Sequence, residues 1–175
     1  MACSLSTGIL TVDCMDGVGG IASVRIAEKA SIDTITRSDQ RITAISMESG
    51  DYFYYFAIDQ EKASATSVET KNVANGTVSW VHTLQSTWRK LSYTKANIIR
   101  VLAQNPALVA IVEDNNGNYL MLGYNLGGHI TGITGSTGAA IGDANGYDFT
   151  FTANDKHDWY YVDSSVISGI TDPAS

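Results

Sequence analysis

The chain has 175 residues, of which 44% are hydrophobic, 9% aromatic and only 17% charged. Eleven Lys and Arg stand against eighteen Asp and Glu, which gives a formal net charge of −7 and a pI of about 4.7. This acidic balance argues against nucleic-acid binding through clustered basic side chains. No apolar run approaches the roughly 20 residues of a membrane-spanning helix, and no secretory signal is visible. The length predicts a single domain over residues 1–175.

The start of the chain, residues 1–20, is predicted to form an irregular N-terminal arm or an edge strand. It contains the only two cysteines, Cys3 and Cys14. Without a nearby histidine they do not make a zinc site. Two alternatives stay open for them: reduced, partly buried thiols in a reducing cytosol, or a disulfide that closes a short loop.

Strand-forming residues separated by turn signals follow the arm and predict strands over 21–28, 33–36 and 41–47. The next run, Tyr52 to Ile58, is aromatic on both faces. A strand with bulk on both faces is covered on both faces. The cover is either the chain's own core or another subunit.

A long β-hairpin is predicted over residues 63–85. Asn75-Gly76 at its centre is a strong two-residue turn signal, because both positions must accept a positive φ. Its strands are rich in Thr and Ser and suit edge-to-edge pairing with a neighbour.

One helix is predicted over residues 92–105, and Pro106 ends it. Ile98, Val101 and Leu102 lie at helical spacing and are expected to cover a sheet. A single helix of this length cannot form a bundle. It must pack on a sheet or close the end of a barrel.

The second half of the chain predicts further strands at 107–112, 118–124, 147–153 and 159–162. Between them, residues 123–146 carry half of the sixteen glycines and predict a flexible or tightly turning loop. Residues 164–175 predict a short polar tail. The fold class is therefore mainly β, a sandwich or barrel with one flanking helix (92–105) and a long hairpin (63–85).

No catalytic motif is present: the chain lacks a nucleophile elbow, a zinc-protease helix, a C-x-x-C pair and a phosphate-binding loop. His82, His129 and His157 are far apart in the sequence. His82 alternates with Trp80 and Leu84, which predicts packing rather than catalysis. We expect a protein that is not an enzyme, with no catalytic residues.

Two acidic turns, at residues 114–118 and 143–148, superficially suggest calcium binding. Neither has the ligand spacing of an EF-hand loop, and both contain the Asn-Gly pair of a tight turn. The carboxylate pairs Asp13/Asp16 and Asp155/Asp158 are compatible with acid–base chemistry, but nothing marks a pocket around them. No metal or cofactor is expected.

Several turn motifs, taken in order, resemble the small structural proteins of tailed phages that infect Bacteroidota. The matching stretches span most of the chain: Met1-Ala2-Cys3, Asp13-Cys14, Gly17-Val18-Gly19-Gly20-Ile21, Asn75-Gly76-Thr77, Val112-Glu113-Asp114-Asn115-Asn116-Gly117, Leu122-Gly123, Thr137-Gly138 and Gly142-Asp143-Ala144-Asn145-Gly146-Tyr147.

Within that group the order of elements is similar to a tail tube subunit. The resemblance implies a β-sandwich or barrel with a flanking helix, stacked as hexameric rings around a DNA channel. The partners it implies are copies of the chain, other tail proteins and DNA that passes without specific binding, with no membrane. The location would be the virion tail, after synthesis in the host bacterial cytoplasm. The N-terminal arm and the glycine-rich loop would then be candidates for contacts between rings.

An acidic chain agrees with a channel that must not hold DNA. Asp59, Glu61 and Glu69 are the candidates to face that channel. Two other interpretations remain open: a capsid decoration or head–tail ring protein, and a β-sandwich carbohydrate-binding or adhesin module. For a binding module, Trp80, Trp88 and Trp159 would have to supply an exposed aromatic patch.

Overall fold

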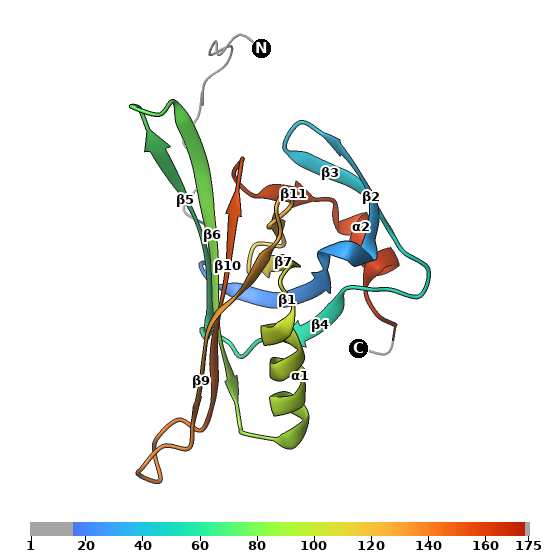
Figure 1. Cartoon of the computed structure of the whole chain (residues 1–175). Helices are drawn as coiled ribbons and strands as arrows, with labels where there is room; N and C mark the ends of the chain where they lie inside the picture. Colours follow the sequence, from blue (N-terminus) through green and yellow to red (C-terminus); the bar gives the residue numbers. More distant parts are fainter. Residues whose placement is uncertain (1–15, 174–175) are drawn as a thin grey trace.

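The computed structural model describes residues 16–173 and confirms the predicted mainly β fold (Figure 1). The strands are β1 Ile21–Glu28, β2 Ile32–Ser38, β3 Arg41–Met47, β4 Tyr54–Ala57, β5 Ala63–Asn72, β6 Thr77–Arg89, β7 Leu108–Asp114, β8 Tyr119–Leu122, β9 Gly128–Ser136, β10 Gly146–Asp155 and β11 Tyr160–Val162. The helices are α1 Tyr93–Gln104 and α2 Ser164–Ile170, with a short 3-10 turn at Lys29–Ser31.

The strands form two layers. The long sheet has the order β9-β10-β6-β5 and is antiparallel throughout. The central sheet has the order β4-β1-β7-β8-β11-β3-β2 and contains one parallel pair, β11 with β3. The two sheets are joined by a single residue pair, Leu108 with Gly128. In Figure 1 the long sheet stands at the left and the central sheet packs against it.

The main core fills the space between the two sheets. Leu84 from β6 and Phe151 from β10 are fully buried there, opposite Val24 and Val112 of the central sheet. Because side chains alternate along a strand, every second residue of β6 and β10 points into this core. The residues between them face away from it.

A second core lies on the opposite face of the central sheet. Ile111 and Met121 are fully buried there and pack with Ile167 and Ile170 of α2. The central sheet is therefore covered on both faces, which agrees with the continuous apolar run of β7.

Helix α1 matches the predicted range, but the prediction of its buried face was wrong. Ser92 caps it, because the Ser92 side chain accepts a hydrogen bond from the Lys95 backbone N–H. Ile99 is buried, whereas Ile98 is 39% and Val101 53% exposed. Of the predicted stripe, only Leu102 packs against the main core.

Two further predictions need correction. The stretch 123–146 is not simply a loop, because β9 occupies its middle and pairs with β10. The tail 164–175 begins with α2, whose Ile167 and Ile170 are buried, so the expected single helix has a short companion. These two isoleucines form the buried side of α2, and the many small and polar residues around them in the sequence gave no indication of a helix.

The predicted hairpin is confirmed as β5 and β6, although β6 runs on to Arg89. The turn is not the predicted two-residue one: residues 73–76 connect Asn72 with Thr77, and of the Asn75-Gly76 pair only Gly76 has a positive φ, of +65°. The tip of this hairpin projects at the upper end of the long sheet in Figure 1, and the loop after β9 projects at the lower end.

In the aromatic run before β5, the phenylalanines pack inside the protein and the tyrosines are exposed to solvent. Phe53 is fully buried and Phe56 packs against the main core, whereas Tyr54 and Tyr55 are exposed.

Of the predicted N-terminal arm, residues 16–20 are described. Val18 exchanges hydrogen bonds with the side chain of Asn116 in the β7–β8 turn. Cys3 and Cys14 lie outside the described residues. No helix among the described residues is long and apolar enough to cross a membrane.

Candidate assembly surface

The residues that the sequence singled out for chemistry lie apart. His82 is buried in β6, while His129 in β9 and His157 after β10 are exposed. Within residues 16–173, no three His, Cys, Asp or Glu side chains are grouped so as to hold a metal ion. Asp13 lies outside the described residues.

His82 packs as predicted. Its ring centroid lies 6.5 Å from that of Trp159, and its Nδ1 accepts a hydrogen bond from the Gly123 backbone N–H at 3.4 Å. Burial lowers the pKa of His82, because desolvation outweighs the attraction of Asp155 and Asp158. The ring therefore belongs to the core and is held in its neutral form.

The acidic turns use their carboxylates to hold their own backbone. Asp114 Oδ1 accepts hydrogen bonds from the Asn118 N–H at 2.7 Å and the Asn116 N–H at 2.9 Å. Asp143 Oδ2 accepts from the Ala139 and Ala140 N–H groups at 2.8 and 2.7 Å. The hydrogen bonds from Ala140 and Ala139 hold the pKa of Asp143 below its ordinary value. Such bonds are the chemistry of a turn.

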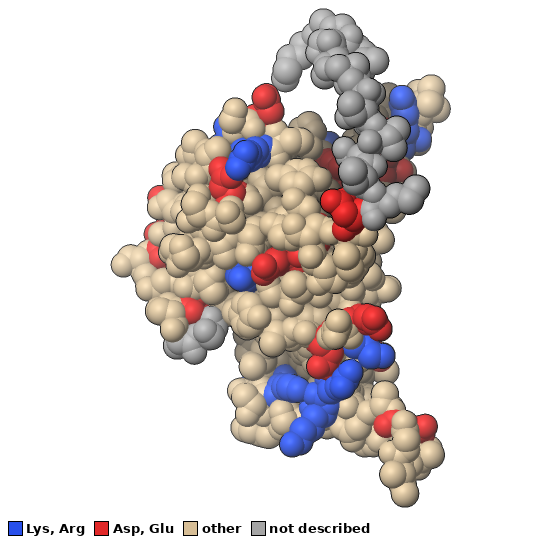
Figure 2. All heavy atoms as spheres, turned by 180° about the vertical axis from the view of Figure 1, so that it is seen from behind, with Lys and Arg blue, Asp and Glu red and all other residues tan. Residues whose placement is uncertain are grey.

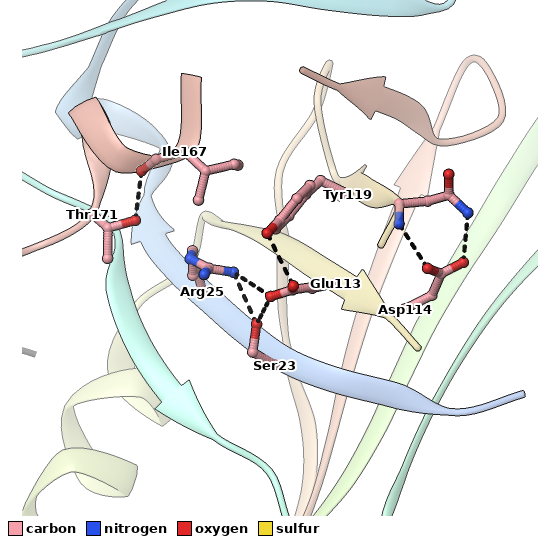
Figure 3. A network of polar contacts seen from close by, with 8 residues as sticks. Ser23, Arg25, Glu113, Asp114, Tyr119, Ile167 and Thr171 are labelled. Carbon is pink, nitrogen blue, oxygen red and sulfur yellow. Dashed lines mark hydrogen bonds and ion pairs between the residues drawn. The ribbon is translucent and has the colours of Figure 1, made fainter. Parts of the chain in front are cut away.

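A polar network crosses the α2-facing side of the central sheet (Figure 3). Glu113 Oε2 accepts a hydrogen bond from Ser23 Oγ at 2.6 Å, and Glu113 Oε1 accepts one from Tyr119 Oη at 3.0 Å. Arg25 Nη1 lies 3.4 Å from Glu113 and donates to Ser23 at 2.9 Å. The Arg25 guanidinium also lies 5.3 Å from the ring centroid of Tyr55.

Glu113 is the acceptor at the centre of this network. Burial raises the pKa of Glu113, but the hydrogen bonds from Ser23 and Tyr119 and the charge of Arg25 outweigh it, so the pKa lies below its ordinary value. The opposite charges of Arg25 and Glu113 meet within four neighbouring strands, and Arg25 Nε is left buried without a hydrogen-bond partner. The network clamps the central sheet and has the character of a structural element.

The outer face of the long sheet is the most distinctive surface of the molecule. We call it the threonine face, and it is defined by the residues that alternate with the buried ones: Ser64, Thr66, Val68, Thr70, Ser79, Val81, Thr83, Gln85, Thr87, His129, Thr131, Thr134, Asp148, Thr150, Thr152 and Asn154.

These residues include no Lys or Arg, but Arg89, which ends β6, alternates with the buried Trp88 in the same way and adds one positive charge at the end of the face. Asp148 is their one carboxylate, and its Oδ1 accepts a hydrogen bond from Thr87 Oγ1 at 2.6 Å. Thr131 Oγ1 lies 3.0 Å from Thr152 Oγ1 on the neighbouring strand. The threonine face is thus a broad, nearly uncharged surface of hydroxyl groups. By contrast, Figure 2 shows Lys and Arg side chains gathered at the lower part of the molecule, where β6 ends and α1 begins.

Both edges of the long sheet are free among the described residues. β5 pairs with β6 alone, and β9 pairs with β10 and, at Gly128 only, with β7. Proteins commonly protect such edges with charges, prolines or bulges that twist the edge away. The stretches 63–68 and 129–136 contain no proline and no Asp, Glu, Lys or Arg. Two such features lie elsewhere on these edges: β5 continues into Glu69 and Lys71, and the pairing of β9 with β10 contains a β-bulge.

The hydrogen-bonding groups of the β5 edge can be assigned. The Thr87 N–H donates to the Lys62 carbonyl, so in this antiparallel ladder the bonded positions of β5 are the even-numbered ones. The N–H and C=O groups of Ala63, Ala65 and Ser67 therefore point to the free edge. These groups are available to another strand.

The threonine face and the β9 edge were missed in the sequence because glycines interrupt the alternation at Thr131-Gly132 and Thr134-Gly135. The spacing of Thr131 and Thr134 around Ile133 is the signal that was available. Of the acidic residues expected to face a channel, Glu61 lines a hollow together with Ser64, Thr87 and Asp148 of this face. Asp59 lies between β4 and β5, and Glu69 is paired with Trp80 on the opposite side of the sheet.

The aromatic platform of a binding module is not formed by the tryptophans. Trp88 is buried, with its ring stacked on Phe56 at 5.3 Å between centroids, and Trp80 and Trp159 are half-buried.

Comparison of the chain with protein-family models, with curated proteins and with solved structures found no match.

Proposed function

We propose that this protein is a non-enzymatic structural subunit that joins copies of itself through the edges of the long sheet, as a tail tube subunit of a phage virion. The observation that carries the proposal is the pair of edges, β5 and β9, on opposite sides of one sheet, with uncharged stretches at 63–68 and 129–136. An exposed edge without charges or proline is a template for another strand.

The strand directions suit a ring. β9 and β5 run in opposite directions, because three antiparallel pairings separate them. Rotation about an axis parallel to the strands keeps their directions, so β5 of one copy meets β9 of the next in antiparallel orientation. Such a head-to-tail contact closes into a ring when the rotation divides a full turn. Hexameric rings are what the tail tube resemblance implies.

The threonine face gives the ring a surface suited to a channel. A continuous sheet formed by successive copies would present hydroxyl groups and few charges on one side. DNA is held mainly by Lys and Arg, and a surface that has them only at one end, at Lys62 and Arg89, lets it pass. In this proposal the other partners are further tail proteins at the ends of the tube.

The proposal is tested by negative-stain electron microscopy and light scattering of the purified protein over a range of concentrations. Rings or filaments are expected at high concentration, and uniformly monodisperse monomers would contradict the proposal. Ala65→Pro removes an N–H that points to the free edge without breaking the β5–β6 ladder. This variant should fold with unchanged circular dichroism and fail to assemble.

A further inference from the structure

A fully exposed isoleucine stands at the tip of the loop between β9 and β10. Ile141 is the most exposed large apolar side chain among the described residues. The loop is internally ordered by Asp143, whose carboxylate accepts the Ala139 and Ala140 N–H groups. An apolar side chain held outward on an ordered loop has the form of an anchor for a complementary pocket.

A groove of about 380 Å³ lies between β4 and the start of α1. Phe56, Trp88 and Ile98 give it an apolar lining, and Lys95 and Arg89 also border it. Arg89 is paired with Asp59 at 2.9 Å. Lys95 donates a hydrogen bond to the Arg89 carbonyl and has no carboxylate partner in the described part of the chain. The groove therefore fits an apolar side chain next to an acidic one.

The proposed pairing of β5 with β9 brings these two features together. In an antiparallel pair, Ser136 at the end of β9 lies beside Ala63 at the start of β5 of the next copy. The loop 137–145 then continues next to that copy's β4–β5 connection, which includes Asp59. Ile58 and Asp59 are part of the wall of the groove.

We propose that Ile141 seats in the groove between β4 and α1 of the neighbouring copy, with Asp143 facing Lys95. This contact rests on the proposed edge pairing for its geometry and adds a side-chain anchor to it. The occupant of the groove is thus a second copy of this chain. The pairing of the backbone edges determines that the two strands run antiparallel. The Ile141 contact determines the register of β9 against β5 of the next copy.

Disulfide trapping tests this contact in the full chain. Cys3→Ser and Cys14→Ser provide a background without other thiols. Protein carrying Ile141→Cys is mixed with protein carrying Ile98→Cys, and the covalent dimer is measured under mild oxidation. A matched control mixes Ile141→Cys with Val73→Cys, whose exposed site lies at the tip of the β5–β6 hairpin. We expect at least about fivefold more covalent dimer from the first mixture. Equal yields would overturn the contact.

A second variant separates this contact from the proposed function. Ile141→Asp alters a fully exposed side chain, so its thermal unfolding should match that of the wild type. The concentration needed for half-maximal assembly should rise roughly tenfold or more, because burial of one isoleucine is lost. Assembly at an unchanged concentration would overturn the contact and leave edge pairing standing. Absence of wild-type assembly would overturn edge pairing, and the trapping yield would then decide the contact by itself.

Discussion

The two faces of the long sheet have opposite character although the same strands build both. Toward the central sheet, β6 and β10 present Leu84 and Phe151, which are fully buried. Away from it they present polar residues such as Thr83, which pairs with Thr152, and Thr150, which pairs with Gln85. The inner face supplies hydrophobic stabilisation to one chain. The outer face contributes little to it, and in our proposal this face lines the channel of the ring.

The largest expected effect comes from adjacent residues on these two faces. Phe151→Ala removes a fully buried ring from the main core and should lower the free energy of unfolding by about 4 kcal/mol. Thr150→Ala on the threonine face should change it by less than about 0.5 kcal/mol. Urea denaturation of both variants measures the difference, and similar losses would show that the outer face is also part of the folding core.

Substitution of polar residues should also lower stability more inside the protein than on the threonine face. Glu113→Ala leaves the guanidinium of Arg25 buried without its carboxylate and should cost about 3 kcal/mol. Asp148→Ala on the threonine face removes only an exposed hydrogen bond to Thr87 and should cost less than about 1 kcal/mol. The double variant Arg25→Met with Glu113→Leu should recover much of the loss. A Glu113→Ala protein as stable as the wild type would contradict the structural role of the network.

Helix α1, at one end of the main core, also has a buried side and an exposed side that can be compared. Leu102→Asp places a carboxylate against that core and should cost about 2 kcal/mol. Val101→Asp lies on the exposed side of the helix and should change stability by less than about 0.5 kcal/mol. Thermal unfolding compares them. If Val101→Asp were the more damaging, the assignment of the buried face would be wrong.

The smallest effect is a pH dependence from His82 on the inner face. Its pKa in the folded chain lies below the ordinary 6.5, so the unfolded chain takes up the proton first as pH falls. The stabilisation is present above pH 6.5 and is lost as pH falls through the interval between 6.5 and the folded-state pKa. Unfolding free energies across that interval should decrease in the wild type and change less in His82→Gln. Identical profiles would exclude His82 as the source.

Residue patterns predicted much of this fold. β1 and β3 begin and end at the predicted residues, and the β5–β6 hairpin follows from Asn75-Gly76. β9 was not predicted because glycines replace side chains at positions that would have shown alternation. α2 was not predicted because its stability comes from Ile167 and Ile170 packing on a distant strand layer, which local sequence does not reveal.

The buried side of α1 shows a different limit of sequence reasoning. Ile98, Ile99, Val101 and Leu102 form two overlapping stripes, and either is compatible with helical spacing. Only the position of the helix at the end of the core selects Ile99 and Leu102. The threonine face required the same kind of information, because it unites strands that are up to about 90 residues apart in the chain.

The central claim is that the free edge of β5 is paired when copies assemble, and residue-resolved hydrogen exchange tests it most directly. The amides of Ala65 and Ser67 point to the free edge, whereas that of Thr66 is bonded to β6. At low concentration we predict fast exchange at Ala65 and Ser67 and slow exchange at Thr66. At assembling concentrations all three should be slow. Fast exchange at Ala65 and Ser67 at the highest concentration would contradict edge pairing.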